Sequence, residues 1–170
     1  MPAHADSFDL GTLSLSPGEG RRLDLEVALG DFGFGDQHYE TPPLVPARLD
    51  VSRMVGGGYS LRLRFDAPLS GPCMRCLEEA SPVTSVDARE VDQPGGGEEL
   101  TSPYVEGDQL DLRAWAHDAY ALALPPQVLC RPECLGLCAQ CGANLNADPG
   151  HAHETAPDPR WAKLRELKFE

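Results

Sequence analysis

The clearest hydrophobic pattern along the chain is an alternation on both sides of a glycine run. Leu49 and Val51 are apolar at every second position, and after Gly56–Gly58 the same alternation extends over residues 59–65. Arginine and aspartate take the intervening positions in the second of these segments. Because successive side chains of a strand point to opposite faces, this pattern predicts a β-hairpin with one buried face.

Shorter alternations predict further strands. One expected strand covers residues 13–15 and a second covers 23–27, with the turn residues 17–20 between them. Residues 83–91 supply another candidate strand. Residues 30–45, by contrast, contain three glycines and two consecutive prolines, which favours a loop or an irregular edge.

Asp111 marks the start of a long helical pattern. Apolar residues recur after it at helical spacing as far as Ala123, and two prolines that begin at Pro125 end the run. The pattern predicts an amphipathic helix of about three turns whose apolar stripe covers the sheet. A shorter helix is expected near the C-terminus, with Asp158 as N-cap and Pro159 at the first helical position.

Together these elements predict an α+β fold, in which an antiparallel β-sheet with a covering helix carries a small Cys/His-rich C-terminal zinc-knuckle module. We expect residues 1–128 to form the β-rich core with its covering helix. Residues 129–170 should form the knuckle and the C-terminal helix. With 170 residues in total, the two parts should pack as one domain.

Charge narrows the choice of partner. The 14 lysines and arginines against 27 acidic residues give a net charge of −13, which argues against avid, sequence-independent binding to nucleic acid. Residues 87–118 carry nine acidic and two basic residues. This segment is interpreted as a solvated surface, with a docking surface for a basic partner as the alternative. Four arginines could form a basic patch, but an ordinary solvated sheet face is the favoured interpretation: Arg48, Arg53, Arg62 and Arg64.

The sequence also bears on the compartment. No apolar run is long enough to span a bilayer, and the first twenty residues lack a basic segment followed by an apolar core. We therefore expect a cytoplasmic protein without a membrane partner, in which thiols stay reduced. In such a compartment six cysteines serve as metal ligands, as redox groups or as small buried side chains.

The spacing of the cysteines favours metal binding. Cys138 and Cys141 are separated by two residues and followed by Gly142, so they can grip one tetrahedral ion while the glycine allows the turn. His151 and His153 would complete a Cys₂His₂ set, and the other four cysteines form a second set. We expect one or two structural Zn²⁺ ions. The expected division places Cys73, Cys76, Cys130 and Cys134 on one ion and Cys138, Cys141, His151 and His153 on the other.

Other uses of these residues fit less well. Thioredoxin-type chemistry would place the cysteine pair at a helix N-terminus after a parallel strand, whereas Cys73 follows an antiparallel hairpin. A catalytic zinc needs an open coordination position and a general base, for which Glu133 or Glu154 is available. A nucleophilic Cys–His pair is formally possible, but nothing singles out one cysteine. No role is assigned to His4, His38 or His117.

Five segments carry a resemblance to a known family: Gly71–Leu77, Leu122–Pro125, Cys130–Cys134, Gly136–Asn146 and Asp158–Trp161. In these segments the chain resembles the YceD family, the large ribosomal RNA subunit accumulation proteins. Many relatives carry a Cys-x-Cys where this sequence has His151 and His153, and some lack residues 138–153 altogether, which implies two separable sites. The resemblance implies a role in large-subunit ribosomal RNA and no established enzymatic activity.

Two functional hypotheses follow. The first is a non-catalytic ribosome-biogenesis factor that supports synthesis, processing or stability of large-subunit ribosomal RNA, with structural zinc. Its partner would be the large-subunit RNA precursor or a basic ribosomal protein or assembly factor, and no small-molecule substrate is expected. The alternative is a metal- or thiol-dependent enzyme, namely a hydrolase acting on RNA. Four protein ligands per metal indicate the first hypothesis, and an open coordination position beside a carboxylate indicates the second.

Overall fold

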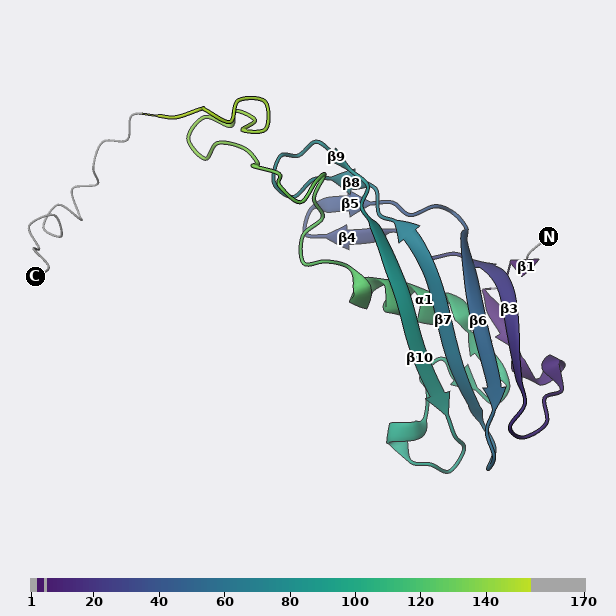
Figure 1. The fold of residues 1–170 in the computed structure, drawn as a ribbon. Coiled ribbons are helices and arrows are strands. Elements are labelled where there is room, and N and C mark those ends of the chain that lie inside the picture. The colour runs from purple at the N-terminus through teal and green to yellow at the C-terminus, as the bar shows by residue number, and fades with distance from the viewer. Residues whose placement is uncertain (1–2, 5, 154–170) are drawn as a thin grey trace, which may run out of the picture.

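A five-stranded sheet lies at the centre of the molecule, as the computed structural model shows for residues 3–4 and 6–153, the described part of the chain (Figure 1). The first strand runs parallel to its neighbour, and the other neighbours are antiparallel. The predicted antiparallel sheet is therefore confirmed, with a two-residue parallel addition at one edge. In spatial order the strands are β1 (Ala3–His4), β3 (Gly20–Val27), β6 (Val45–Arg53), β7 (Tyr59–Pro68) and β10 (Val83–Asp92).

The hairpin β6–β7 is the predicted alternation around the glycine run. Leu49 pairs with Leu63 across the two strands, and neither side chain is exposed. All three glycines of the turn have positive φ, where a side chain is strained. Gly58 has φ +80°, and a Cβ there would lie 1.9 Å from the carbonyl oxygen of Asp92. Only glycine fits at that position.

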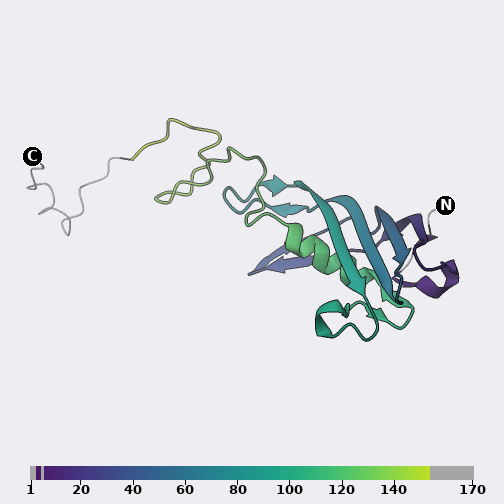
Figure 2. The same cartoon turned by 60° about the horizontal axis from the view of Figure 1, so that its bottom comes forward.

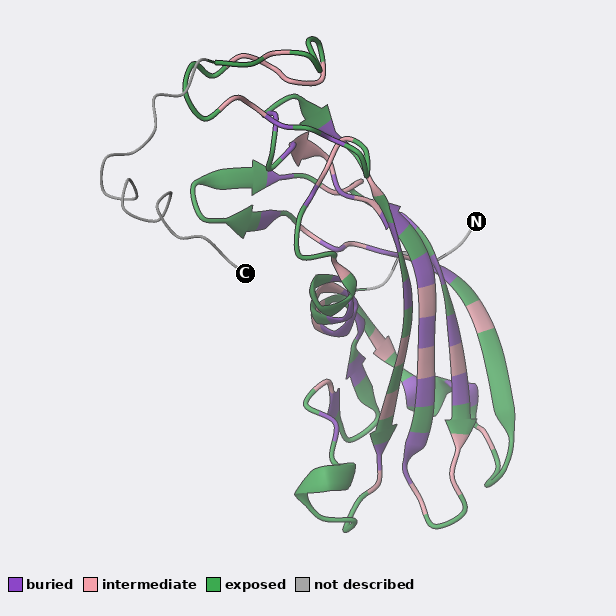
Figure 3. Cartoon of the chain, turned by 60° about the vertical axis from the view of Figure 1, so that its left-hand side comes forward, coloured by how far each residue is buried: buried purple, intermediate pink, exposed green. Residues whose placement is uncertain are grey.

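The helix α1 (Leu112–Ala123) covers one face of the sheet, as predicted (Figures 2 and 3). The Asp111 side chain accepts a hydrogen bond from the Ala114 amide at 2.9 Å and so caps the first turn. Trp115 and Tyr120 are buried, and the Tyr120 hydroxyl donates to the Ala67 carbonyl of β7 at 3.0 Å. Of the helices in the described part of the chain, none is long and apolar enough to cross a membrane. The helix expected at Asp158 lies outside the described residues.

Two predictions for the N-terminal part are wrong. Residues 13–15 are not a strand, because Leu10–Leu13 forms the short 3-10 helix η1, in which the Asp9 side chain caps the Gly11 amide at 2.9 Å. Leu10 and Leu13, three residues apart, both point into the core. The expected loop at 30–45 contains a hairpin, β4 (Phe32–Phe34) and β5 (Gln37–Tyr39), and the Phe32 ring stacks on His117 of α1 at 4.4 Å.

Smaller elements complete the fold. A three-stranded sheet lies beside the start of α1, and the acidic, glycine-rich connection after β10 contains one short 3-10 helix. Between β7 and β10 the chain makes a minute hairpin at the end of the central sheet (Figure 1). These elements are β11 (Val105–Glu106), β12 (Gln109–Asp111) and β2 (Ser7–Asp9) in the small sheet, η2 (Glu98–Leu100) in the connection, and β8 (Gly71–Pro72) with β9 (Glu79–Ala80) in the hairpin.

Replacing Leu63 with alanine should lower the free energy of unfolding by about 2–5 kcal/mol, because the change leaves a cavity in the middle of the core. Ser60→Ala on the same strand alters an exposed side chain and should change that free energy by less than about 0.5 kcal/mol. Urea denaturation followed by circular dichroism measures both variants. Equal losses would contradict the packing described for β7.

Candidate metal centre

The first cysteine pair lies in the turn of the hairpin β8–β9. Cys73 donates its amide to the Glu78 carbonyl at 2.7 Å, and the Leu77 amide donates to the Cys73 carbonyl at 3.0 Å. Leu77 closes the turn in the left-handed conformation, with φ +63°. That conformation costs a residue with a side chain about 1–2 kcal/mol, and the Leu77 side chain stays 62% exposed.

The second cysteine pair has the same local geometry. The Gly142 amide donates to the Cys138 carbonyl at 2.8 Å, and Gly142 has φ +73°. Cys138 in turn donates its amide to the Ala143 carbonyl at 2.8 Å. The two Cys-x-x-Cys loops are therefore equivalent knuckles, with leucine in the first at the position that glycine takes in the second.

Four cysteines come together around the first knuckle. The sulfurs of Cys73 and Cys134 lie 3.8 Å apart, and those of Cys76 and Cys130 lie 3.7 Å apart. All four sulfurs are within 4.8 Å of one another. A zinc–sulfur bond of about 2.3 Å gives a tetrahedral edge of about 3.8 Å, so the spacing suits a tetrahedral ion. Cys73 and Cys134 are almost completely buried. The group could hold a metal ion.

The chain after α1 carries Cys130 and Cys134 to this place. The Met74 amide donates to the Val128 carbonyl at 2.9 Å, and the Arg75 guanidinium donates to the Cys134 carbonyl at 3.1 Å. Gly136 has φ +79°, and a Cβ there would lie 3.1 Å from the Arg75 carbonyl oxygen. The first knuckle and the segment after the helix thus approach closely through backbone contacts.

The second group consists of Cys138, Cys141, His151 and His153, whose ligand atoms also lie within 4.8 Å of one another. The sulfur of Cys141 is 3.2 Å from His151 Nε2 and 3.3 Å from His153 Nε2, and the two Nε2 atoms are 2.8 Å apart. The tetrahedral edges expected for zinc with nitrogen and sulfur ligands are about 3.3–3.6 Å. The distances between these ligand atoms are therefore equal to or slightly shorter than the edges expected around a zinc ion. This group too could hold a metal ion.

The second nitrogen of His151 faces a carboxylate. Asp148 Oδ2 lies 3.8 Å from His151 Nδ1, and the His151 amide donates to the Asp148 carbonyl at 3.1 Å. Carboxylates in this position commonly orient a metal-binding histidine so that its other nitrogen faces the ion. The arrangement leaves Nε2 of His151 directed at Cys141 and His153.

Hydrogen bonds to sulfur set the acidity of the thiols. Burial raises the pKa of Cys73, but the backbone amides of Cys76 and Arg75 outweigh it and lower that pKa to about 6. The amides of Gln140 and Cys141 likewise lower the pKa of Cys138 to about 6. The Glu78 amide lowers the pKa of Cys76, yet burial and the neighbouring thiols raise it to about 12. A cation at the centre of each group would therefore favour the ionised form of its cysteine thiols.

Sequence reasoning missed the side chains that support the first group. Asn146 donates Nδ2 to the Cys134 sulfur at 3.4 Å, and this hydrogen bond is the main cause that lowers the pKa of Cys134. Asn144 donates to the Glu78 carboxylate at 2.8 Å. The Tyr39 hydroxyl, on β5, donates to the Pro72 carbonyl just before the knuckle at 2.9 Å. Both asparagines lie in the segment 136–146, but neutral amides carry no spacing that marks such a role.

Two further histidines lie outside both groups. His38 faces Asp31 at 3.7 Å, and His117 Nδ1 contacts the Leu29 carbonyl at 2.6 Å, so neither belongs to the two groups. Glu133 is exposed, and Glu154 lies outside the described residues. Nothing is described for the His4 side chain.

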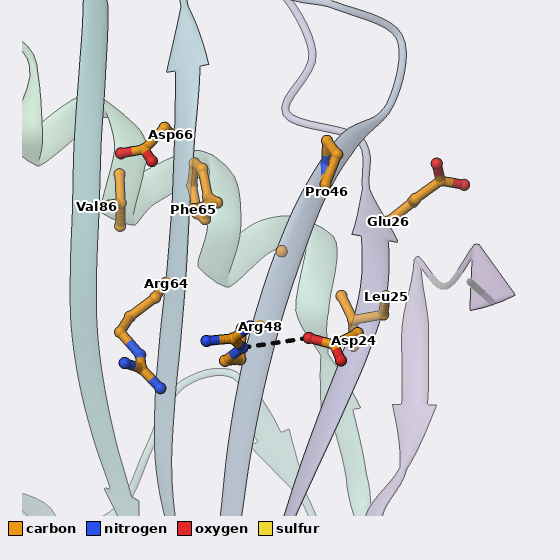
Figure 4. A pocket seen from close by; sticks show the side chains of 10 residues that line it. Asp24, Leu25, Glu26, Pro46, Arg48, Arg64, Phe65, Asp66 and Val86 are labelled. Carbon is orange, nitrogen blue, oxygen red and sulfur yellow. Dashed lines mark hydrogen bonds and ion pairs between the residues drawn. The ribbon is translucent and has the colours of Figure 1, made fainter. Parts of the chain in front are cut away.

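Three arginines of the candidate basic patch lie on the sheet face opposite α1, among aspartates: Arg48, Arg62 and Arg64. Arg48 pairs with Asp24 at 3.2 Å, at a groove on this face (Figure 4). A hydrogen bond from Arg22 is the main cause that keeps the pKa of Asp50 below its usual value, and Arg64 also pairs with Asp50. Charges of both signs therefore alternate across this face.

Arg53 does not belong to this patch, and its expected place there is wrong. It has the same alternation as Val51, so it lies on the opposite side of the sheet from Arg48. Its guanidinium covers the Tyr59 ring at 4.5 Å and pairs with Asp108 at 3.7 Å.

Comparison with known proteins gives one family. The model of the family described as "Large ribosomal RNA subunit accumulation protein YceD" matches residues 61–168, which include both Cys/His groups. No solved structure gave a significant match.

The relatives are bacterial and plant proteins. An uncharacterized protein of Mycobacterium tuberculosis is 40% identical over 107 residues, covering 59% of this chain and 51% of the relative. One from Mycobacterium leprae is 34% identical over 107 residues, covering 59% and 49%. A chloroplastic large ribosomal RNA subunit accumulation protein YCED homolog of Zea mays is 28% identical over 180 residues, covering 83% and 58%. This chain spans about half the length of the mycobacterial relatives.

Protein purified without chelator should contain two divalent metal ions per chain, because each group supplies four ligands. Cys76→Ala and Cys141→Ala should each remove one ion and leave the other bound. Elemental analysis of the wild type and both variants measures the count. Wild-type protein without metal would contradict both sites, and a single variant that loses both ions would contradict the division between them.

Proposed function

This chain belongs to the YceD family of large ribosomal RNA subunit accumulation proteins, and we propose that it is a non-catalytic ribosome-biogenesis factor. In this proposal it supports the synthesis, processing or stability of large-subunit ribosomal RNA. The observation that carries the proposal is the family match, which extends from Leu61 near the start of β7 past the second Cys/His group. The name of the Zea mays relative refers to the same role.

The two Cys/His groups are proposed to hold structural Zn²⁺. A Cys₄ set and a Cys₂His₂ set are donor combinations that zinc prefers, and four protein ligands fill its tetrahedral shell. A hydrolytic zinc would instead keep one position open beside a general base. Glu78 is a carboxylate close to the first group, with Oε2 3.8 Å from the Cys76 sulfur, but Asn144 holds its other oxygen. These observations support a structural role over an RNA hydrolase.

The first zinc site is proposed to join two parts of one domain, namely the core of residues 1–128 and the module that begins at residue 129. The first group takes two cysteines from each part. The hydrogen bonds of Met74 and Arg75 to the segment after α1 support the same arrangement.

A basic ribosomal protein or assembly factor is the partner that the charges favour, ahead of the ribosomal RNA precursor itself. The net charge is −13, and Arg48, Arg62 and Arg64 are each paired with an aspartate. An acidic surface attracts a basic protein and speeds the encounter, whereas it repels phosphate. A cytoplasmic location stays a prediction, which the six free cysteines support and which the chloroplastic name of the Zea mays relative leaves open.

Depleting the protein in cells should reduce mature large-subunit ribosomal RNA relative to small-subunit ribosomal RNA. Quantifying both species and their precursors measures the effect, and re-expression of the wild type provides the control. A double variant, Cys76→Ala with Cys141→Ala, should restore less large-subunit RNA than the wild type. Unchanged levels of both ribosomal RNAs after depletion would overturn the proposed function.

Replacing Arg62 and Arg64 with alanine should leave any affinity for ribosomal RNA nearly unchanged, because aspartates already neutralise both guanidinium groups. Titrations at several salt concentrations measure this affinity and its salt dependence. A direct RNA surface would instead lose affinity and about one unit of salt slope for each phosphate contact removed. That outcome would favour RNA over a basic protein as the partner.

A further inference from the structure

The side chain of Asn146 makes all its polar contacts at the edge of the first Cys group. One Nδ2 hydrogen points at the Cys134 sulfur at 3.4 Å, and the other at Asn144 Oδ1 at 2.9 Å. Its Oδ1 accepts from the Leu135 amide at 2.8 Å, next to the ligand. Both donors and the acceptor of this amide are engaged, so its orientation is fixed. Asn146 therefore holds Cys134 from two sides.

Asn144 extends the same contact to the first knuckle. It accepts from the Asn146 amide at 2.9 Å, and it donates Nδ2 to Glu78 Oε1 at 2.8 Å. Glu78 Oε2 is 3.8 Å from the Cys76 sulfur. The two asparagines thus connect Cys134 with the environment of Cys76, one cysteine from each half of the first group.

Both asparagines belong to the loop that the second group closes. They lie between Cys141 and His151, whose ligand atoms are 3.2 Å apart. The base of this loop is anchored by the bridge between Leu137 and Asn144, and by the Leu145 amide, which donates to the Gly136 carbonyl at 2.9 Å. A metal ion bound to the second group would restrict the loop. Less conformational entropy would then be lost when the Asn146 side chain is fixed against the Cys134 sulfur.

We propose that Asn146 couples the two metal sites, so that loading of the second site strengthens metal binding at the first. Asn146 is a positioning residue: it orients the Cys134 ligand and donates a hydrogen bond to its sulfur. Four thiolates around a divalent cation carry a net charge of −2, and donors to sulfur stabilise that charge. Linkage makes the coupling reciprocal, so a metal at the first site also strengthens the second. This inference rests on the proposed metal sites.

The test measures metal affinity at the first site in the full chain, by competition of a chelator for Co²⁺. Tetrathiolate and Cys₂His₂ sites give different visible spectra with Co²⁺, so each site is followed separately. Asn146→Ala should weaken the first site on the order of 10- to 100-fold while both sites can still be loaded. Cys141→Ser, which opens the second site, should also weaken the first.

The double variant, Cys141→Ser with Asn146→Ala, should weaken the first site little more than Cys141→Ser alone, because Asn146 is no longer held in place. Gln109→Ala, which changes an exposed side-chain amide on β12, is the control and should change neither site. If Asn146→Ala fails to fold, the wild type compared with Cys141→Ser still tests the coupling.

Two failures are distinguishable. Wild-type protein that binds no metal removes the proposed sites themselves. If the wild type loads both sites but Cys141→Ser binds metal at the first site with the same affinity as the wild type, only the coupling is overturned. An equal effect of Asn146→Ala with the second site intact or opened also overturns it.

Discussion

The approach of the segment after α1 to the turn of residues 73–78 is the contact on which the C-terminal part of the structure depends. Two backbone hydrogen bonds, from Met74 to Val128 and from Leu137 to Arg75, fix this approach. The first cysteine group, the placement of the second knuckle and the contacts of Asn146 all follow from it. The hairpin β4–β5 supports the turn, since Tyr39 of β5 is fully buried and its hydroxyl donates to the Pro72 carbonyl.

The sheet face opposite α1 illustrates a different constraint. Charged residues keep an exposed face hydrated. In a chain with a net charge of −13, acidic residues gathered on one face without basic partners would repel one another. Here arginines of β6 and β7 are paired with aspartates on neighbouring strands, so the face is locally close to neutral. The excess negative charge lies elsewhere, above all in residues 87–118.

The elements that could be predicted from the sequence are those fixed by interactions between residues close together in the chain. The hairpin β6–β7 and α1 were predictable because alternation, the Asp111 cap and the prolines after Ala123 all act within a few residues. The 3-10 helix at Leu10 was missed because its two buried leucines can equally be assigned to a strand. Cysteine spacing indicated the two groups, and the structure brings the predicted sets together. The supporting role of Asn146 depends on a tertiary approach between distant segments, which no local pattern encodes.

The two Cys/His groups differ in the length of chain that each one spans, and this difference has a consequence in time. The second group draws its ligands from residues 138–153, so a ligand set can assemble as soon as that short segment exists. The first group joins Cys76 to Cys130, which are 54 positions apart with β10 and α1 between them, so closing it costs more chain entropy unless those elements have already formed. A metal ion at the first group would therefore favour chains whose core has assembled, whereas an ion at the second group would depend on a short local segment alone.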